Sequence, residues 1–356
     1  MKKLAGATLA FLKSCVSSPL NALLTVLVLA ALAVTVVPLW RWALFDAVWS
    51  GGPQTCQGAE GACWPFVKAR WRLIVYGNYP IAEHWRVDLA ALTGGLGLAL
   101  LFLPKVPHKM IIAVLLLIPY PLLAALLLRG GLPGLPVVPT QLWGGLMVTA
   151  VASVWTIGTS IPLGLLLAFA RRSSLPVVAY MAAGFIEFVR GLPLLGVLFL
   201  AIVLFPFFVP PGLEFDKLLR ALIAYTIYDA AILAEIFRGG LQAIPSHQWE
   251  AGTSLGLKRR QILWLVVIPQ VVTICLPGIV GASVMIVKET TTILIVGLFD
   301  FLGVLQAGTS DPAWLVGEQV PATAYFFAGV VFWAVCFAMS RYSARLERSL
   351  RAGRAT

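Results

Sequence analysis

Long apolar stretches dominate this sequence and restrict it to a membrane-embedded helical fold. A bilayer core of about 30 Å needs roughly 20 apolar helical residues, and eight stretches qualify. They lie at about 20–39, 87–103, 110–128, 143–170, 177–204, 218–237, 262–287 and 322–340. Charged residues make up only 12% of the chain, against roughly 25% in soluble domains. We therefore predict an all-α integral membrane protein with about eight transmembrane helices.

The distribution of lysine and arginine predicts which loops are cytoplasmic. Eight spans put both termini on one side of the membrane, and that side carries 16 of the 26 basic residues. The opposite side carries nine. Because cytoplasmic loops are enriched in basic residues, we expect both termini to be cytoplasmic. The net charge of +11 then reflects membrane orientation, and we expect no nucleic-acid binding because the charges form no basic face.

A Pro/Gly-rich segment at 130–139 breaks any helix and divides the chain. Residues 1–139 are expected to form a three-helix membrane extension, with a tryptophan-rich periplasmic loop at about 41–86. Residues 140–345 are expected to form a five-helix core with a cytoplasmic loop at about 239–263, and residues 346–356 a basic cytoplasmic tail. Lys2 and Lys3 precede the first apolar run as in a signal peptide. That run is long enough to span, so we expect a retained anchor.

Five cysteines are scattered along the chain without a CxxC pair or a metal-ligand cluster. Cys56 and Cys63 both fall in the 41–86 loop. If that loop is periplasmic, a disulfide between them is chemically reasonable, and two unlinked thiols are the alternative. The three histidines are isolated in sequence, so we expect no metal site.

The segment between the sixth and seventh apolar stretches is too polar to span and too long for a tight turn. Ser246 suits the N-cap of a short helix that ends near Leu255. Gly256 suits the C-cap, where a positive φ is needed. Such a helix suits either binding to a protein outside the membrane or lying on lipid headgroups. The residues alone leave both interpretations open.

This segment resembles the EAA loop of binding-protein-dependent ABC permeases. The resemblance rests on the spacing of Glu250-Ala251-Gly252, Gly256 and Val266-Val267-Ile268-Pro269. The departures are Gly252 for Ala, Val266 for Ile and Ile268 for Leu. The segments AEIFRGGLQAIPSHQWEAG at 234–252, FVRGLPLL at 188–195 and Lys288-Glu289-Thr290 are similar to polar amino-acid permeases, although Ser246-His247 replaces the usual Lys-Gly. The match covers about residues 140–341, and the N-terminal part resembles general L-amino-acid permeases of Gram-negative bacteria.

The resemblance implies a MetI-like ABC importer permease core in the bacterial inner membrane, without catalysis or a cofactor of its own. It implies that Glu250, Ala251, Gly252 and Gly256 dock on an ATP-binding subunit, present in two copies. It further implies a second, related permease subunit in a heterodimer, a periplasmic amino-acid-binding protein and an L-amino-acid substrate. The sequence has no GxxxxGK[ST] phosphate loop, which agrees with ATP hydrolysis by another chain.

Several charged residues lie within or at the ends of apolar stretches, where a charge costs about 2.5–3.5 kcal/mol at a helix centre. Glu187 and Arg190 are three residues apart and can pair on one face. Lys288 and Glu289 are adjacent, point apart, and each need another partner. We treat all four as candidates for the translocation path or a gate. The alternative is pairing between helices or snorkelling to the interface.

Two other function classes compete with an ATP-driven amino-acid importer. An ion-coupled secondary transporter of small polar solutes would show inverted repeats and broken helices at matching positions, and we find no such repeat. An integral membrane enzyme would need His, Asp or Glu clustered on one face, whereas the acidic residues here are scattered. We therefore expect a permease subunit.

Overall fold

The computed structural model describes residues 13–103, 106–210, 212 and 215–352. Lys2, Lys3 and the last residues of the expected basic tail lie outside this part. Within it the chain forms helices and loops, with isolated bridges in place of strands. The prediction of an all-α protein is confirmed.

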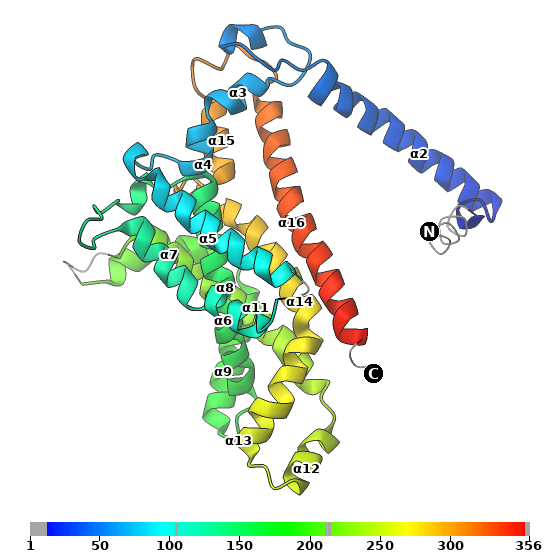
Figure 1. The fold of residues 1–356 in the computed structure, drawn as a ribbon, viewed down its shortest axis with the longest axis vertical. Helices are drawn as coiled ribbons and strands as arrows, with labels where there is room; N and C mark the ends of the chain where they lie inside the picture. Colours follow the sequence, from blue (N-terminus) through cyan, green and yellow to red (C-terminus); the bar gives the residue numbers. More distant parts are fainter. Residues whose placement is uncertain (1–12, 104–105, 211, 213–214, 353–356) are drawn as a thin grey trace. The chain divides into compact units, whose positions relative to one another are not determined.

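The described residues form fifteen α-helices, which are named by the numbering that Figure 1 uses. Their bounds are α2 (Pro19–Trp40), α3 (Trp64–Ala69), α4 (Trp71–Tyr76), α5 (His84–Phe102), α6 (Lys109–Leu117), α7 (Pro119–Arg129), α8 (Gly145–Arg171), α9 (Pro176–Gly191), α10 (Leu194–Phe199), α11 (Lys217–Gln242), α12 (Ser246–Ser254), α13 (Arg259–Ile262), α14 (Ile268–Glu289), α15 (Phe301–Thr309) and α16 (Val320–Ala352).

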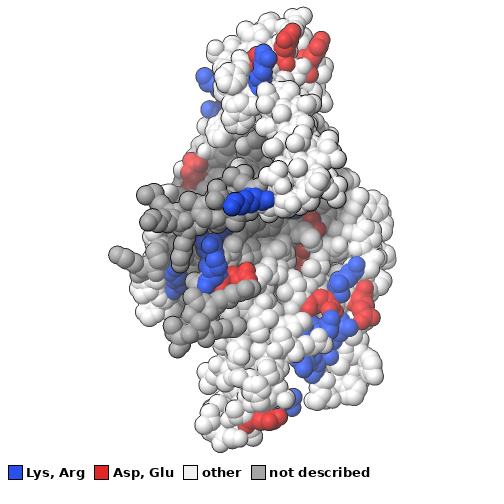
Figure 2. Space-filling model, turned by 90° about the vertical axis from the view of Figure 1, so that its right-hand side faces the viewer, with Lys and Arg blue, Asp and Glu red and all other residues white. Residues whose placement is uncertain are grey.

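Four helical stretches of the described chain are long and apolar enough to cross a membrane. They are Pro19–Phe45, Gly145–Arg171, Arg259–Val296 and Val320–Arg348, and two bent helix pairs raise the number to six. The expected spans at 87–103 and 218–237 lie in α5 and α11, outside these six. Because α11 has five charged residues along its length, it is less apolar than the others. The visible surface in Figure 2 is mostly uncharged, but the count of eight spans stays a prediction.

The expectation of one continuous span at 177–204 is wrong. Helix α9 ends at Gly191, and the helical segment that follows is turned by 103°. Pro193 explains the break, because proline has no N–H to donate and disfavours a helical conformation in the preceding residue. Leu192 is accordingly extended, with φ −88° and ψ 143°. The expected span at 110–128 is also divided, into α6 and α7, by a bend of 42°.

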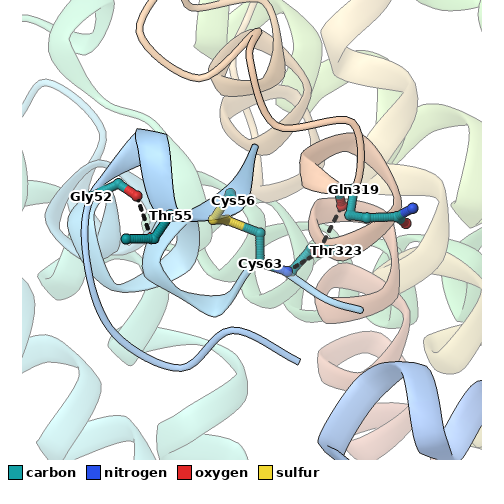
Figure 3. Close-up of a disulfide and its surroundings, with 6 residues drawn as sticks. All are labelled: Gly52, Thr55, Cys56, Cys63, Gln319 and Thr323. Carbon is teal, nitrogen blue, oxygen red and sulfur yellow. Dashed lines mark hydrogen bonds between the residues drawn. A yellow bond between two sulfur atoms is a disulfide. The ribbon is translucent and has the colours of Figure 1, made fainter. Parts of the chain in front are cut away.

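The chain forms two compact units, which we call the first unit (1–70 and 308–326) and the second unit (71–307 and 327–356). A disulfide between Cys56 and Cys63 closes a loop in the first unit, with the two Cα atoms 5.7 Å apart. The Cys63 N–H donates to Thr323 Oγ1 at 2.8 Å (Figure 3). The disulfide alternative for these cysteines is therefore confirmed, and the loop is tied to the beginning of α16.

An ion pair adds a second connection within the first unit. Arg70 pairs with Asp311 across more than two hundred residues of sequence. The N–H of Ala313 and the Arg70 guanidinium together hold the pKa of Asp311 below its ordinary value. The 41–70 segment and the 308–326 segment thus fold as one body, although 237 residues separate them.

Removing the disulfide is expected to destabilise the first unit by about 2.5 kcal/mol, because the unfolded loop regains the entropy that the cross-link removes. Cys56→Ser/Cys63→Ser should therefore lower the midpoint of thermal unfolding in detergent. Cys336→Ser, at a free cysteine in α16, is the control and should leave the midpoint unchanged. Equal midpoints for the double variant and the wild type would contradict a stabilising role.

Helices α8 and α11 form the centre of the second unit and run in the same direction. Thr159 of α8 contacts Thr226 of α11 through a hydrogen bond of 2.7 Å, and Arg171 reaches Glu235 farther along both helices. Gly164 permits the close approach, because a Cβ there would lie 2.7 Å from Leu233 Cβ. Helix α14 packs against α11 in the opposite direction, so the three helices form a core that supports the loop around α12.

Candidate functional site

Helix α12 has the cap structure that isolates a short helix from its neighbours. Pro245 is the N-cap and Ser246 is the first helical residue, so the N-cap lies one residue earlier in the chain than expected. At the other end the Leu257 N–H donates to the Gly252 carbonyl at 3.1 Å, and Gly256 has φ +74°. This is a Schellman motif, and the expectation of a positive φ at Gly256 is confirmed.

The inner face of α12 is anchored to the second unit. Gly252 is buried, and a Cβ at this position would lie 2.7 Å from Ile262 Cγ1 of α13. Trp249 packs against the core cluster that contains Phe237 and Leu241 of α11. Gln270 of α14 donates a hydrogen bond of 3.2 Å to Gln248 Oε1. Three helices therefore fix the orientation of α12, and a force on α12 is transmitted to them.

The outer face of α12 is exposed to solvent. Glu250 and Ala251 are both exposed, and Leu255, which follows the last helical residue, is 80% exposed. Figure 1 shows α12 at one end of the second unit, beyond α13. Sequence reasoning missed Leu255, although an apolar residue directly before a capping glycine in a polar loop is a usable signal.

The close contact at Gly252 gives a testable prediction. Gly252→Ala is expected to loosen α12 from α13, because overpacking of this kind costs about 1–3 kcal/mol and outweighs the gain in helix propensity of about 1 kcal/mol. Limited proteolysis of the 245–260 loop should be faster in this variant. Equal cleavage rates in Gly252→Ala and the wild type would show that the contact between Gly252 and Ile262 does not hold α12 against α13.

A charge cluster joins the neighbouring ends of α8, α9 and α11. Arg171 contacts Glu187 at 2.8 Å and Glu235 at 2.6 Å, while Arg190 approaches Glu235 at 3.5 Å and Arg238 contacts it at 2.7 Å. The expected pairing between Glu187 and Arg190 is wrong. Their spacing permits it, but tertiary packing supplies Arg171 and Glu235 as partners. Sequence reasoning did not single out Arg171, which is the residue that bridges the two carboxylates.

Lys288 and Glu289 lie in another region, at the end of α14. Lys288 is exposed, whereas Glu289 is partly buried and its Oε2 has no hydrogen-bond partner in the described structure. The Tyr225 hydroxyl donates to the Glu289 carbonyl oxygen at 3.1 Å. Asp229, one turn along α11 from Tyr225, is also buried with one unpartnered oxygen. The four candidates from sequence thus divide into two sites, and Asp229 was missed.

The described residues contain no group of three or more His, Cys, Asp or Glu side chains placed to hold an ion. The charged side chains near α8, α9 and α11 pair with one another instead.

Comparison with known proteins places the chain in a family. Residues 160–352, 193 of the 356 residues, match the family described as binding-protein-dependent transport system inner membrane component. The inner membrane amino-acid ABC transporter permease protein YhdY of Escherichia coli K12 is 39% identical over 96% of this chain and 92% of its own length. The glutamate/glutamine/aspartate/asparagine transport system permease protein BztC of Rhodobacter capsulatus is 35% identical, over 94% and 92%.

A third relative matches a smaller share of this chain. The probable glutamine ABC transporter permease protein GlnP of Bacillus subtilis is 31% identical over 58% of this chain and 92% of its own length. The family match covers more than half of the chain, and the two longer relatives cover almost all of it. The chain belongs to the binding-protein-dependent transport system inner membrane component family and is a permease subunit of an ATP-driven importer.

Proposed function

We propose that this permease carries amino acids and that α12 is the element through which a separate ATP-binding subunit drives it. The amino-acid assignment draws on the transport functions of YhdY and BztC, which are 39% and 35% identical to this chain over their aligned residues. The coupling assignment rests on one observation: α12 is anchored on its inner face and exposed on its outer face.

The residues in and directly after α12 are proposed to have two roles: some contact the ATP-binding subunit, and others set the packing and the end of the helix. Glu250, Ala251 and Leu255 form the contact surface, because their side chains are exposed. Gly252 and Gly256 give the helix its close packing and its turn. A helix that lay on lipid headgroups would be expected to carry lysine or arginine on its polar face. Helix α12 has neither within Ser246–Ser254, which favours a protein partner.

Co-purification tests this assignment directly. Glu250→Arg is expected to reduce the amount of ATP-binding subunit recovered with the permease by at least tenfold, which corresponds to about 1.4 kcal/mol of lost binding. Glu60→Arg is the matched control, because it reverses the same charge at an exposed glutamate of the other unit. Undiminished recovery with Glu250→Arg would remove α12 as the docking element.

The same complex distinguishes the importer from an ion-coupled transporter. Proteoliposomes that contain the complex should accumulate amino acid only when ATP is supplied to the ATP-binding subunit. Accumulation driven by an ion gradient without ATP would favour the secondary transporter and would contradict the proposed function.

The charged residues are proposed to act at two points on the transport path. Glu187 and Arg190, held by Arg171 and Glu235, form a latch between α8, α9 and α11 that opens when these helices shift as rigid bodies. Lys288 and Glu289 lie at the second point. A substrate with both an ammonium and a carboxylate group suits residues of both signs.

The assembly is proposed to follow the importer pattern. A second, related permease subunit completes a heterodimer, two ATP-binding subunits contact the cytoplasmic side, and a periplasmic binding protein delivers the amino acid. Both termini are proposed to be cytoplasmic in the bacterial inner membrane, with residues 346–356 as a tail. A division into a 1–139 extension and a 140–345 core is supported by the family match, which begins at residue 160.

A further inference from the structure

An apolar groove with a volume of about 190 Å³ lies between α5, α7 and α8 of the second unit. Short side chains leave the space open, because Ala90, Ala91, Ala124, Ala125 and Ala150 all line it. The one phenol in the lining, Tyr120, is satisfied within the protein because its hydroxyl donates to the Ala90 carbonyl oxygen. A molecule in the groove therefore meets hydrocarbon on all sides and needs no polar group there.

The groove opens among side chains that face lipid. Val154 lines it and is itself exposed, and Leu92 of α5 and Leu123 of α7, which lie near lining residues in sequence, are also exposed. In a membrane protein, exposed leucines on a helix contact acyl chains. The part of α8 that lines the groove runs from Leu146 to Trp155, a length of about 14 Å at 1.5 Å per residue. This length suits a hydrocarbon chain.

Two exposed arginines lie close in sequence to residues that line the groove. Arg72 precedes the lining residue Val75 by three positions, and Arg129 directly follows the lining residue Leu128. Neither guanidinium makes an ion pair or side-chain hydrogen bond in the described structure. Exposed Trp71 is adjacent to Arg72, and tryptophan is enriched at the level of lipid headgroups.

We propose that this groove binds one acyl chain of an anionic phospholipid and that Arg72 and Arg129 bind its phosphate. The charge complementarity comes from Arg72 and Arg129, which are exposed, form no ion pair in the described structure and are close in sequence to lining residues. The lipid would fill the space between α5 and α7 of the N-terminal part and α8, and so hold them together. This proposal does not depend on the amino-acid substrate or on the docking of α12.

The test measures which lipids remain on the complex. The complex is purified in a mild detergent from bacterial membranes, and the bound ratio of phosphatidylglycerol to phosphatidylethanolamine is compared with the ratio in the membrane by native mass spectrometry. Enrichment of phosphatidylglycerol is expected for the wild type. Arg72→Ala/Arg129→Ala should lower the enrichment by about fivefold for each arginine removed. Arg172→Ala removes an exposed arginine at the far end of α8 and should change nothing.

The hydrocarbon part of the site is tested separately. Ala150→Leu fills the groove and should release the bound lipid, while its thermal unfolding midpoint in lipid-free detergent should stay at or above the wild-type value. A bound ratio equal to that of the membrane in the wild type would overturn the proposal. So would cross-linking of Ala150→Cys to a second copy or to another subunit, because the groove would then be a protein interface.

Discussion

Arg86→Met is expected to lower the free energy of unfolding by about 3–5 kcal/mol, because it breaks a buried ion pair and leaves its partner unpaired. The Arg86 side chain is completely buried, and its Nε lies 2.7 Å from Glu83 Oε2. Its Nη1 also donates to the Pro136 carbonyl oxygen at 2.9 Å. One side chain thus joins the start of α5 to the Pro/Gly segment that precedes the α8 region. The measurement is thermal unfolding of the full chain in detergent.

Two further variants separate the ion pair from the loss of side-chain volume. Arg41→Met removes an exposed arginine that lies 3.6 Å from Asp46, and pairs of this kind contribute about 0–1 kcal/mol. Adding Glu83→Met to Arg86→Met removes the unpaired carboxylate and should recover part of the loss. Similar shifts for Arg86→Met and Arg41→Met would contradict the assigned role of Arg86.

Local rules predicted much of this fold because they depend on residues close in sequence. The helix at α12 and the left-handed Gly256 follow from cap chemistry within about ten residues. The break at Pro193 was visible as a proline, but its 103° angle was not. That angle depends on how the following segment packs, which is a tertiary property.

Partners and cavities could not be predicted, because they depend on helices that are distant in sequence. The spacing of Glu187 and Arg190 suggested an ion pair between these two residues. In the structure Glu187 pairs with Arg171 of α8, and Arg190 approaches Glu235 of α11. The groove is built from alanines of three helices, and no single helix shows it. Ion pairs between helices and grooves of this kind become visible only when the packing of the helices in three dimensions is known.

The disulfide bears on orientation independently of the basic residues. Structural disulfides persist in oxidising compartments and are rare in the bacterial cytoplasm. The bond between Cys56 and Cys63 therefore supports the proposed periplasmic side of the 41–86 loop. The count of lysines and arginines favours the same side through a different physical effect, the retention of positive charge in the cytoplasm. Helix α12, separated from that loop by the proposed spans, is then proposed to be cytoplasmic.

Glu235→Ala is expected to destabilise the protein by about 3 kcal/mol, because a mostly buried carboxylate that neutralises several cations is lost. Arg171, Arg190 and Arg238 all lie within 3.5 Å of Glu235, whose side chain is only 17% exposed. Without it three guanidinium groups repel one another, and only Arg171 keeps a carboxylate partner, Glu187. Amino-acid uptake should fall together with the unfolding midpoint.

Glu187→Ala is the matched comparison, since Glu187 belongs to the same cluster but is 65% exposed. Its loss should cost about 0–1 kcal/mol, and the small effect should shrink further at high salt because exposed pairs are screened. The effect of Glu235→Ala should persist at high salt. If both variants unfold at the wild-type temperature but lose uptake, the cluster acts in gating without a role in stability. If both retain uptake and stability, the proposed latch is wrong and the cluster is a surface feature of these helix ends.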